Sequence, residues 1–177
     1  MKGIDVANFF IDLAINIDDD SVTNLKIQKL LYFSQGYALA KLGKPLFSDN
    51  IEAWEMGPVV PAVYSALKQN GRNPIPHTVG EFSEEVFSND ELDLLLGINE
   101  KYGQYTASKL VDMSHDTDPW KDNYCPENRH ANISNESIKD YFSRLPDLPQ
   151  FQLPDLETIG YIDEEGFTVL PKEWNDE

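Results

Sequence analysis

The chain has 177 residues, of which 41% are hydrophobic and 11% aromatic, a composition that excludes an intrinsically disordered protein. Its single cysteine, Cys125, excludes an intramolecular disulfide. The net charge of −17 disfavours binding to nucleic acid or to an anionic membrane, because both need a basic surface, and favours a basic protein partner.

The first part of the chain predicts two long helices. Apolar residues recur at helical spacing over residues 4–17. A second helix is expected over residues 24–42, capped by Thr23 or Asn24 and ended by Gly43. Because this second segment is apolar around most of its circumference, we expect it to be the central helix of the fold.

The middle of the chain predicts one extended segment and one helix. Alternating side chains over residues 51–55 favour a short strand. Gly57 and Pro58 predict a turn that leads into a third helix over residues 59–68. Prolines and glycines over residues 72–87 predict a loop.

Three more helices are expected before residue 145. They span residues 90–102, 107–114 and 135–144, with Asn89, Thr106 and Ser134 as their N-caps. The segment 115–132 between them contains two prolines and reads as irregular chain.

The C-terminal part differs in composition from the rest. Residues 1–145 hold 13 basic and 22 acidic residues, whereas residues 146–177 hold one basic and nine acidic residues. Prolines predict a linker over about residues 145–156, and segments 158–161 and 167–170 predict a β-hairpin. The expected fold is mainly α: a compact domain of about six helices over 1–145 with a short extended segment, followed by an acidic, Pro-rich linker and hairpin tail over 146–177.

Motifs for catalysis or metal binding are weak in this sequence. It contains no phosphate-binding glycine loop, nucleophile elbow, C-x-x-C or H-E-x-x-H motif. The best metal-like set is His115, Asp116, Asp118, Cys125 and His130, whose spacing fits no zinc pattern. We therefore expect no enzymatic activity, no metal and no cofactor, and we keep a hydrolase using His115 and Cys125 as the weakest alternative.

Three segments together resemble one protein family. They are 24–36 (N-L-K-I-Q-K-L-L-Y-F-S-Q-G), 51–64 (I-E-A-W-E-M-G-P-V-V-P-A-V-Y) and 110–120, which ends in Pro119-Trp120. The chain resembles the Panacea domain, also called the SocA-like or phage-associated GepA-like domain, over about residues 4–144. The resemblance implies a helical, non-enzymatic antitoxin that neutralises a toxin by direct contact.

The resemblance leaves the partner and the mode of action open. The expected partner is a basic toxin encoded by a neighbouring gene, in a prophage or a bacterial genome. Alternatives are an adaptor that delivers the toxin to a protease, and a phage-encoded anti-host or DNA-mimicking protein. A repressor of its own operon would need a local basic face, for which Lys26, Lys29, Lys41 and Lys44 are the candidates. A homo-oligomer is compatible with the sequence.

Eight side chains are the candidates for contact with a partner: Gln28, Lys29, Tyr32, Gln35, Trp54, Tyr64, His115 and Trp120. Gln28, Lys29 and Gln35 lie on an apolar helix, where each needs either a partner or a buried hydrogen bond. Tyr32 is also a core candidate, and His115 with Trp120 could instead lock a loop. No signal peptide and no run of about 18 apolar residues is visible, so we expect a cytoplasmic protein.

Overall fold

The fold is seen in a computed structural model, which describes residues 1–149, 161–162 and 168–169. Seven α-helices lie in this described part, so the predicted mainly α class is confirmed. The helices are α1 (Gly3–Asn16), α2 (Asn24–Tyr37), α3 (Pro61–Leu67), α4 (Asn89–Ile98), α5 (Ala107–His115), α6 (Asp118–Lys121) and α7 (Asn135–Phe142).

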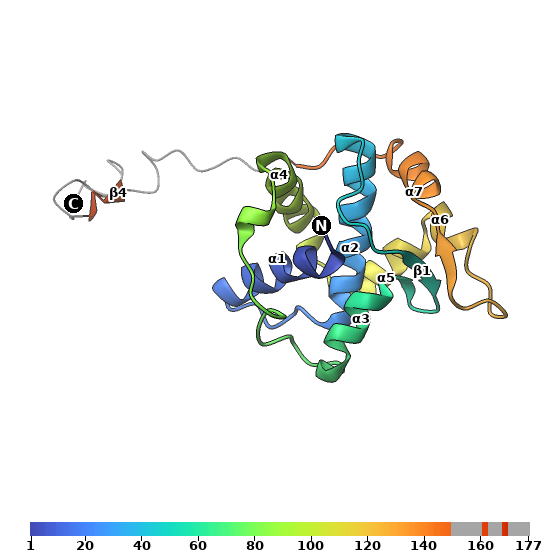
Figure 1. Cartoon of the computed structure of the whole chain (residues 1–177), viewed down its shortest axis with the longest axis horizontal. Helices are drawn as coiled ribbons and strands as arrows, with labels where there is room; N and C mark the ends of the chain where they lie inside the picture. The colour runs from blue at the N-terminus through green and yellow to red at the C-terminus, as the bar shows by residue number, and fades with distance from the viewer. Residues whose placement is uncertain (150–160, 163–167, 170–177) are drawn as a thin grey trace.

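Helix α2 forms the centre of the fold, as its sequence predicts (Figure 1). Thirteen of its 14 residues are buried, and α1, α3, α4, α5 and α7 all contact it. The hydroxyl of Thr23 accepts a hydrogen bond from the backbone N–H of Lys26, which confirms the predicted cap. A π-helical turn, η1 (Ala38–Leu42), extends the helix to Gly43, whose φ of 69° is the left-handed conformation expected there.

A small antiparallel sheet packs beside this centre, in the order β2-β1-β3. Strand β1 (Ile51–Trp54) is the predicted extended segment, whereas β2 (Gly57–Val59) and β3 (Ala131–Ile133) were not predicted. The third helix was expected to begin at Val59, but residues 57–59 pair with β1 instead. Helix α3 therefore begins at Pro61. Proline fits the first turn of a helix, because the backbone N–H groups there have no partner within the helix.

Several predicted boundaries shift by a residue or a turn. Ser88, rather than Asn89, caps α4: its Oγ accepts from the N–H of Glu91, and the Glu91 carboxylate accepts from the N–H of Ser88. Short turns extend or precede helices at η2 (Lys68–Asn70), η3 (Glu84–Val86) and η4 (Asn99–Gly103). Helix α6 and most of strand β3 lie in the segment 115–132, for which the sequence predicts irregular chain. The caps at Thr106 and Ser134 are confirmed.

Helices α2 and α7 approach each other closely through an aromatic cluster. The rings of Phe33 and Tyr102 stack at 4.2 Å between centroids, and Phe142 meets Tyr37 edge to face at 5.3 Å. A Cβ at Gly36 would lie 2.4 Å from the ring of Phe142. The absence of a side chain at position 36 is therefore what allows this helix pair to pack.

The described residues after α7 contact the helical body. The hydroxyl of Tyr37 donates to the carbonyl of Pro146, Lys41 forms an ion pair with Asp147, and the side chain of Leu148 lies 3.2 Å from where a Cβ on Gly97 would stand. Farther along, β4 (Tyr161–Ile162) pairs antiparallel with β5 (Thr168–Val169), close to the predicted hairpin segments. The predicted turn at 163–166 lies outside the described residues, and the division at residue 145 stays a prediction.

Candidate interaction site

Four of the eight candidate contact residues lie inside the protein. Gln28, Lys29, Tyr32 and Gln35, all on α2, have exposed fractions of 1% or less. Tyr32 shares a hydrogen bond of 2.8 Å with the hydroxyl of Thr117. These four side chains are therefore not part of an exposed contact surface, which corrects the expectation. They lie in the interior, which the sequence also allowed.

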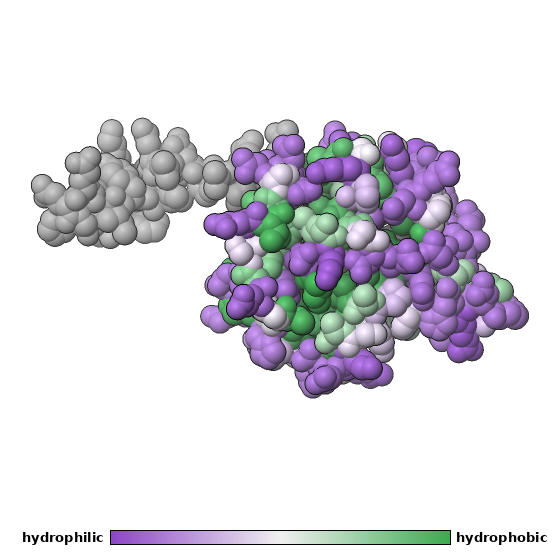
Figure 2. All heavy atoms as spheres, viewed as in Figure 1, coloured by the Kyte–Doolittle hydropathy of each residue, from purple (hydrophilic) through white to green (hydrophobic). Residues whose placement is uncertain are grey.

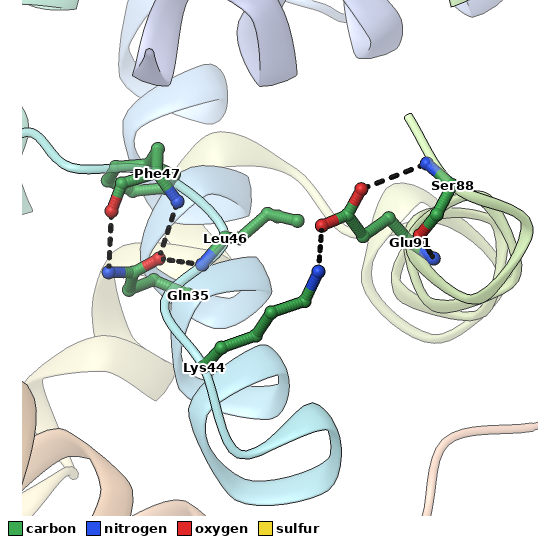
Figure 3. Close-up of polar contacts among 6 residues, drawn as sticks. All are labelled: Gln35, Lys44, Leu46, Phe47, Ser88 and Glu91. Carbon is green, nitrogen blue, oxygen red and sulfur yellow. Dashed lines mark hydrogen bonds and ion pairs between the residues drawn. The ribbon is translucent and has the colours of Figure 1, made fainter. Parts of the chain in front are cut away.

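Gln35 holds the chain that follows the central helix (Figure 3). Its Oε1 accepts from the N–H groups of Leu46 at 2.9 Å and Phe47 at 3.2 Å. Its Nε2 donates to the carbonyl of Phe47 and to Oδ1 of Asn135, both at 3.2 Å. One side-chain amide thus satisfies three backbone groups of a buried loop and links α2 to the start of α7.

Gln28 holds the segment that leads into α3. Its Oε1 accepts from the N–H of Val60 at 2.8 Å, and its Nε2 donates to Oδ1 of Asn24 at 3.0 Å. Asn24 in turn donates to the carbonyl of Tyr64 at 3.2 Å. This chain of amides fixes the start of α3 against α2.

Lys29 places a fully buried amine beneath the β1–β2 turn. Its Nζ donates to the carbonyl of Pro58 at 2.8 Å, and burial lowers its pKa to about 7. Gly57 has a φ of 94°, and a Cβ there would lie 2.8 Å from this Nζ and 2.5 Å from Oγ of Ser114. The backbone of the turn therefore sits directly on α2 and α5, and position 57 needs glycine for both reasons.

The other candidates lie near the surface, where Trp54 and Tyr64 form the walls of a pocket of about 260 Å³. Their rings meet edge to face at 5.0 Å. Leu25, Met56 and Val59 supply the other apolar lining, and the exposed fractions of Met56 and Tyr64 are 51% and 39%. We call this site the β1–α3 pocket.

Figure 2 shows that the visible face of the body is mostly hydrophilic, with apolar patches near α1 and α3.

His115 and Trp120 form an aromatic stack next to the end of β1. The rings of His115 and Trp120 stack at 3.9 Å, and Tyr124 stacks on Trp120 at 4.7 Å. The indole N–H of Trp120 donates to the carbonyl of Trp54 at 2.9 Å. Burial, followed by the charge of Lys29, lowers the pKa of His115. Among the described residues, the buried Nε2 of His115 has no hydrogen-bond partner. This arrangement ties the α6 segment to a wall of the β1–α3 pocket.

The residues considered for metal binding or nucleophilic catalysis have other neighbours. Cys125 donates through Sγ to Glu127 at 2.7 Å, while His130 lies 3.3 Å from the Glu52 carboxylate. Within residues 1–149 and the two short strands beyond, no group of three His, Cys, Asp or Glu side chains could hold a metal ion. The hydrolase alternative therefore gains no support from these positions.

Each of the four lysines considered for a basic face has a hydrogen-bond or ion-pair partner within the protein. Lys26 is buried and donates to Ser21 at 2.6 Å, and Lys29 is buried under Pro58. Lys41 and Lys44 form ion pairs with Asp147 and Glu91. In the part of the chain that the structure covers, no helix has the length and apolar character needed to cross a membrane.

A family model described as "Antitoxin SocA-like, Panacea domain" matches residues 27–121. The chain belongs to this Panacea family. The match runs from within α2 to the end of α6, and therefore includes the Gln28, Lys29 and Gln35 network and most of the β1–α3 pocket. The resemblance noted from the sequence is confirmed.

A curated relative gives the same assignment. The chain is 35% identical over 127 residues to the protein named Antitoxin SocA from Caulobacter vibrioides (strain NA1000 / CB15N). The matched region covers 65% of this chain and 66% of that relative. No solved structure matches the chain.

Proposed function

We propose that this Panacea-family chain is the antitoxin of a toxin–antitoxin pair and neutralises its toxin by direct contact. The observation that carries the proposal is the 35% identity to a protein named Antitoxin SocA. The structure supports a binding role, because its surface holds a pocket with aromatic walls that hydrogen bonds fix in place.

The charge supports a basic toxin as the partner. A net charge of −17 raises the rate at which a basic protein is captured, and complementary fields select it over acidic competitors. Toxins that act on RNA, DNA or nucleotides need basic surfaces, which an acidic antitoxin can cover. The proposed setting is the cytoplasm, with the toxin encoded by a neighbouring gene and no cofactor or catalytic step involved.

Co-expression with the neighbouring gene in a heterologous bacterium tests this proposal. The neighbour's product alone should arrest growth, and this chain should restore it. A harmless neighbour, or growth arrest that persists when this chain accumulates, would contradict the proposal for that pair.

The same strains separate direct inhibition from delivery to a protease. Direct contact predicts that the two proteins co-purify in a stoichiometric complex and that the toxin level stays unchanged. An adaptor predicts that the toxin level falls when this chain is present and recovers when the host protease is deleted.

A further inference from the structure

The β1–α3 pocket has the size and lining of a site for one side chain. Its volume of about 260 Å³ lies below the range of roughly 300–1,000 Å³ that is usual for cofactors and drug-sized ligands. Trp54 and Tyr64 form aromatic walls, and Met56 stands exposed at the rim. Aromatic residues and methionine are enriched at the centres of protein interfaces, where a single anchor residue often fills such a pocket.

The walls of the pocket are held in place before any partner binds. The carbonyl of Tyr64 accepts from Asn24, and the carbonyl of Trp54 accepts from the indole of Trp120. The indole N–H of Trp54 donates to the Glu52 carboxylate at 2.7 Å. A pocket with walls fixed from behind loses little conformational entropy on binding, so that more of the contact energy appears as affinity.

The charges at the rim indicate what should lie next to the apolar anchor. Glu55 lines the pocket and is exposed, and the half-buried Glu52 lies against Trp54. Lys68 is the one cation among the lining residues. The apolar cavity, with the exposed carboxylate of Glu55 at its edge, complements a segment with one large apolar side chain beside a lysine or arginine.

A second hollow on the same body lacks this combination. It measures about 380 Å³ and is lined by polar and acidic side chains of α6 and α7, including Asp118, Asp122 and Asp140. Arg144 already forms an ion pair with Asp118 there at 3.1 Å. Of these two hollows, the β1–α3 pocket is therefore the one that can hold an apolar anchor.

We propose that the β1–α3 pocket binds a short basic segment of the toxin, which packs one aromatic or aliphatic side chain against the paired rings of Trp54 and Tyr64 and places a lysine or arginine against Glu55. This inference rests on the proposed antitoxin function and names the recognition element. It makes affinity depend on the rim residues of the β1–β2 turn and of α3.

Two rim variants test the anchor, with the neighbouring gene's product as the probe. Tyr64→Ala removes one wall but keeps the backbone carbonyl that Asn24 binds, and Met56→Glu places a charge at an exposed position of the rim. Each should weaken the complex by about 30-fold or more, the range of an interface hot spot. Val86→Glu is the matched control, because Val86 is 53% exposed and lies outside the pocket. This control should bind like the wild type.

Glu55→Lys tests the basic character of the segment. Reversing this exposed charge should slow association, and the difference from the wild type should shrink as salt is added. A Glu55→Lys variant that binds as fast as the wild type at low salt would contradict the proposed contact between Glu55 and a lysine or arginine of the partner.

Growth rescue by the same variants separates the two claims. If the wild type fails to neutralise the neighbour's product, the proposed function fails. If the wild type neutralises and binds it, but Tyr64→Ala and Met56→Glu do so equally well at equal protein levels, the pocket inference alone is overturned.

A toxin-independent arm uses a displayed library of random peptides selected on the full-length chain. Enriched peptides should combine an aromatic or aliphatic residue with a neighbouring lysine or arginine, and should lose binding to Met56→Glu but retain binding to Val86→Glu. Peptides that are acidic, or that bind Met56→Glu as well as the wild type, would overturn the inference.

Discussion

Two regions of this protein carry polar or aromatic residues that sequence reasoning offers as contact sites, and the fold uses them in opposite ways. On α2, Gln28, Lys29 and Gln35 are buried, and each binds backbone atoms of another segment. On β1 and α3, Trp54 and Tyr64 line an open pocket. The first region organises the loops around the central helix, and the second is available to a partner.

The difference shows how the interior of the helical body supports its surface. The Gln28–Asn24 pair and Lys29 fix the strands and the helix that carry the pocket walls. Changes on α2 should therefore act on stability, whereas changes at the rim should act on binding. Four predictions test the stability side of this division.

The largest loss of stability is expected for Gln35→Leu. This change leaves the buried N–H groups of Leu46 and Phe47 and the carbonyl of Phe47 without their partner. At about 1 kcal/mol or more for each unsatisfied group, the free energy of unfolding should fall by about 3 kcal/mol in urea denaturation. Gln104→Leu is the control: Gln104 is exposed, and we expect a change within about 0.5 kcal/mol. Equal effects of the two changes would contradict the role of Gln35.

Gly36→Ala should be the next most harmful change. Its new Cβ would stand 2.4 Å from the ring of Phe142, and overpacking of this kind costs about 1–3 kcal/mol, more than the gain of about 1 kcal/mol in helix propensity. Thermal unfolding should show a lower Tm. A second change, Phe142→Leu, should destabilise the Gly36→Ala background less than it destabilises the wild type, and additive losses would argue against the contact.

Lys29→Met should change how stability depends on pH. Burial lowers the pKa of folded Lys29 from 10.5 to about 7, so between these values the unfolded chain binds more protons than the folded one. The contribution of Lys29 to stability therefore rises with pH over this window, by up to about 1.4 kcal/mol per pH unit. Urea denaturation at several pH values should show that the free energy of unfolding of the wild type increases relative to that of the variant as the pH rises from about 7 toward 10.5. Parallel curves from pH 7 upward would show that folded Lys29 keeps its usual pKa.

The smallest effect is expected for Lys44→Ala. Lys44 bonds the Glu91 carboxylate at 2.8 Å, but its side chain is 58% exposed, and exposed pairs contribute about 0.5 kcal/mol (Figure 3). The loss should fade at high salt, because screening weakens the pair in the wild type. A loss above about 2 kcal/mol that salt does not change would mean that this pair belongs to the interior.

The sequence predicted the helices well because their signals are local. Thr23, Thr106 and Ser134 each lie where a short polar side chain can cap a first turn, and each does so. Gly43 follows the same logic at the end of η1. The central position of α2 could be read from its apolar circumference, a property of consecutive residues.

The sheet and the burial of polar residues depend on contacts between distant segments. Strand β3 pairs with β1 across about 80 residues of chain, and its three residues are too few to show a pattern of their own. Gly57 and Pro58 read as a turn in the sequence, but they pair with Trp54 and Ala53 in a tight hairpin whose turn lies at residues 55–56. The partners of Gln28 and Gln35 are backbone groups 32 and 11–12 residues away, so residue type alone could not place these amides inside or outside.

Amide hydrogen exchange, measured on the free chain and on its complex with the neighbouring gene's product, tests the central division most directly. We predict that residues 52–67, which include most of β1 and all of β2 and α3, become more protected in the complex, whereas α2 is strongly protected in both states. New protection confined to α6 and α7, with none over residues 52–67, would contradict the assignment of the β1–α3 pocket as the contact surface.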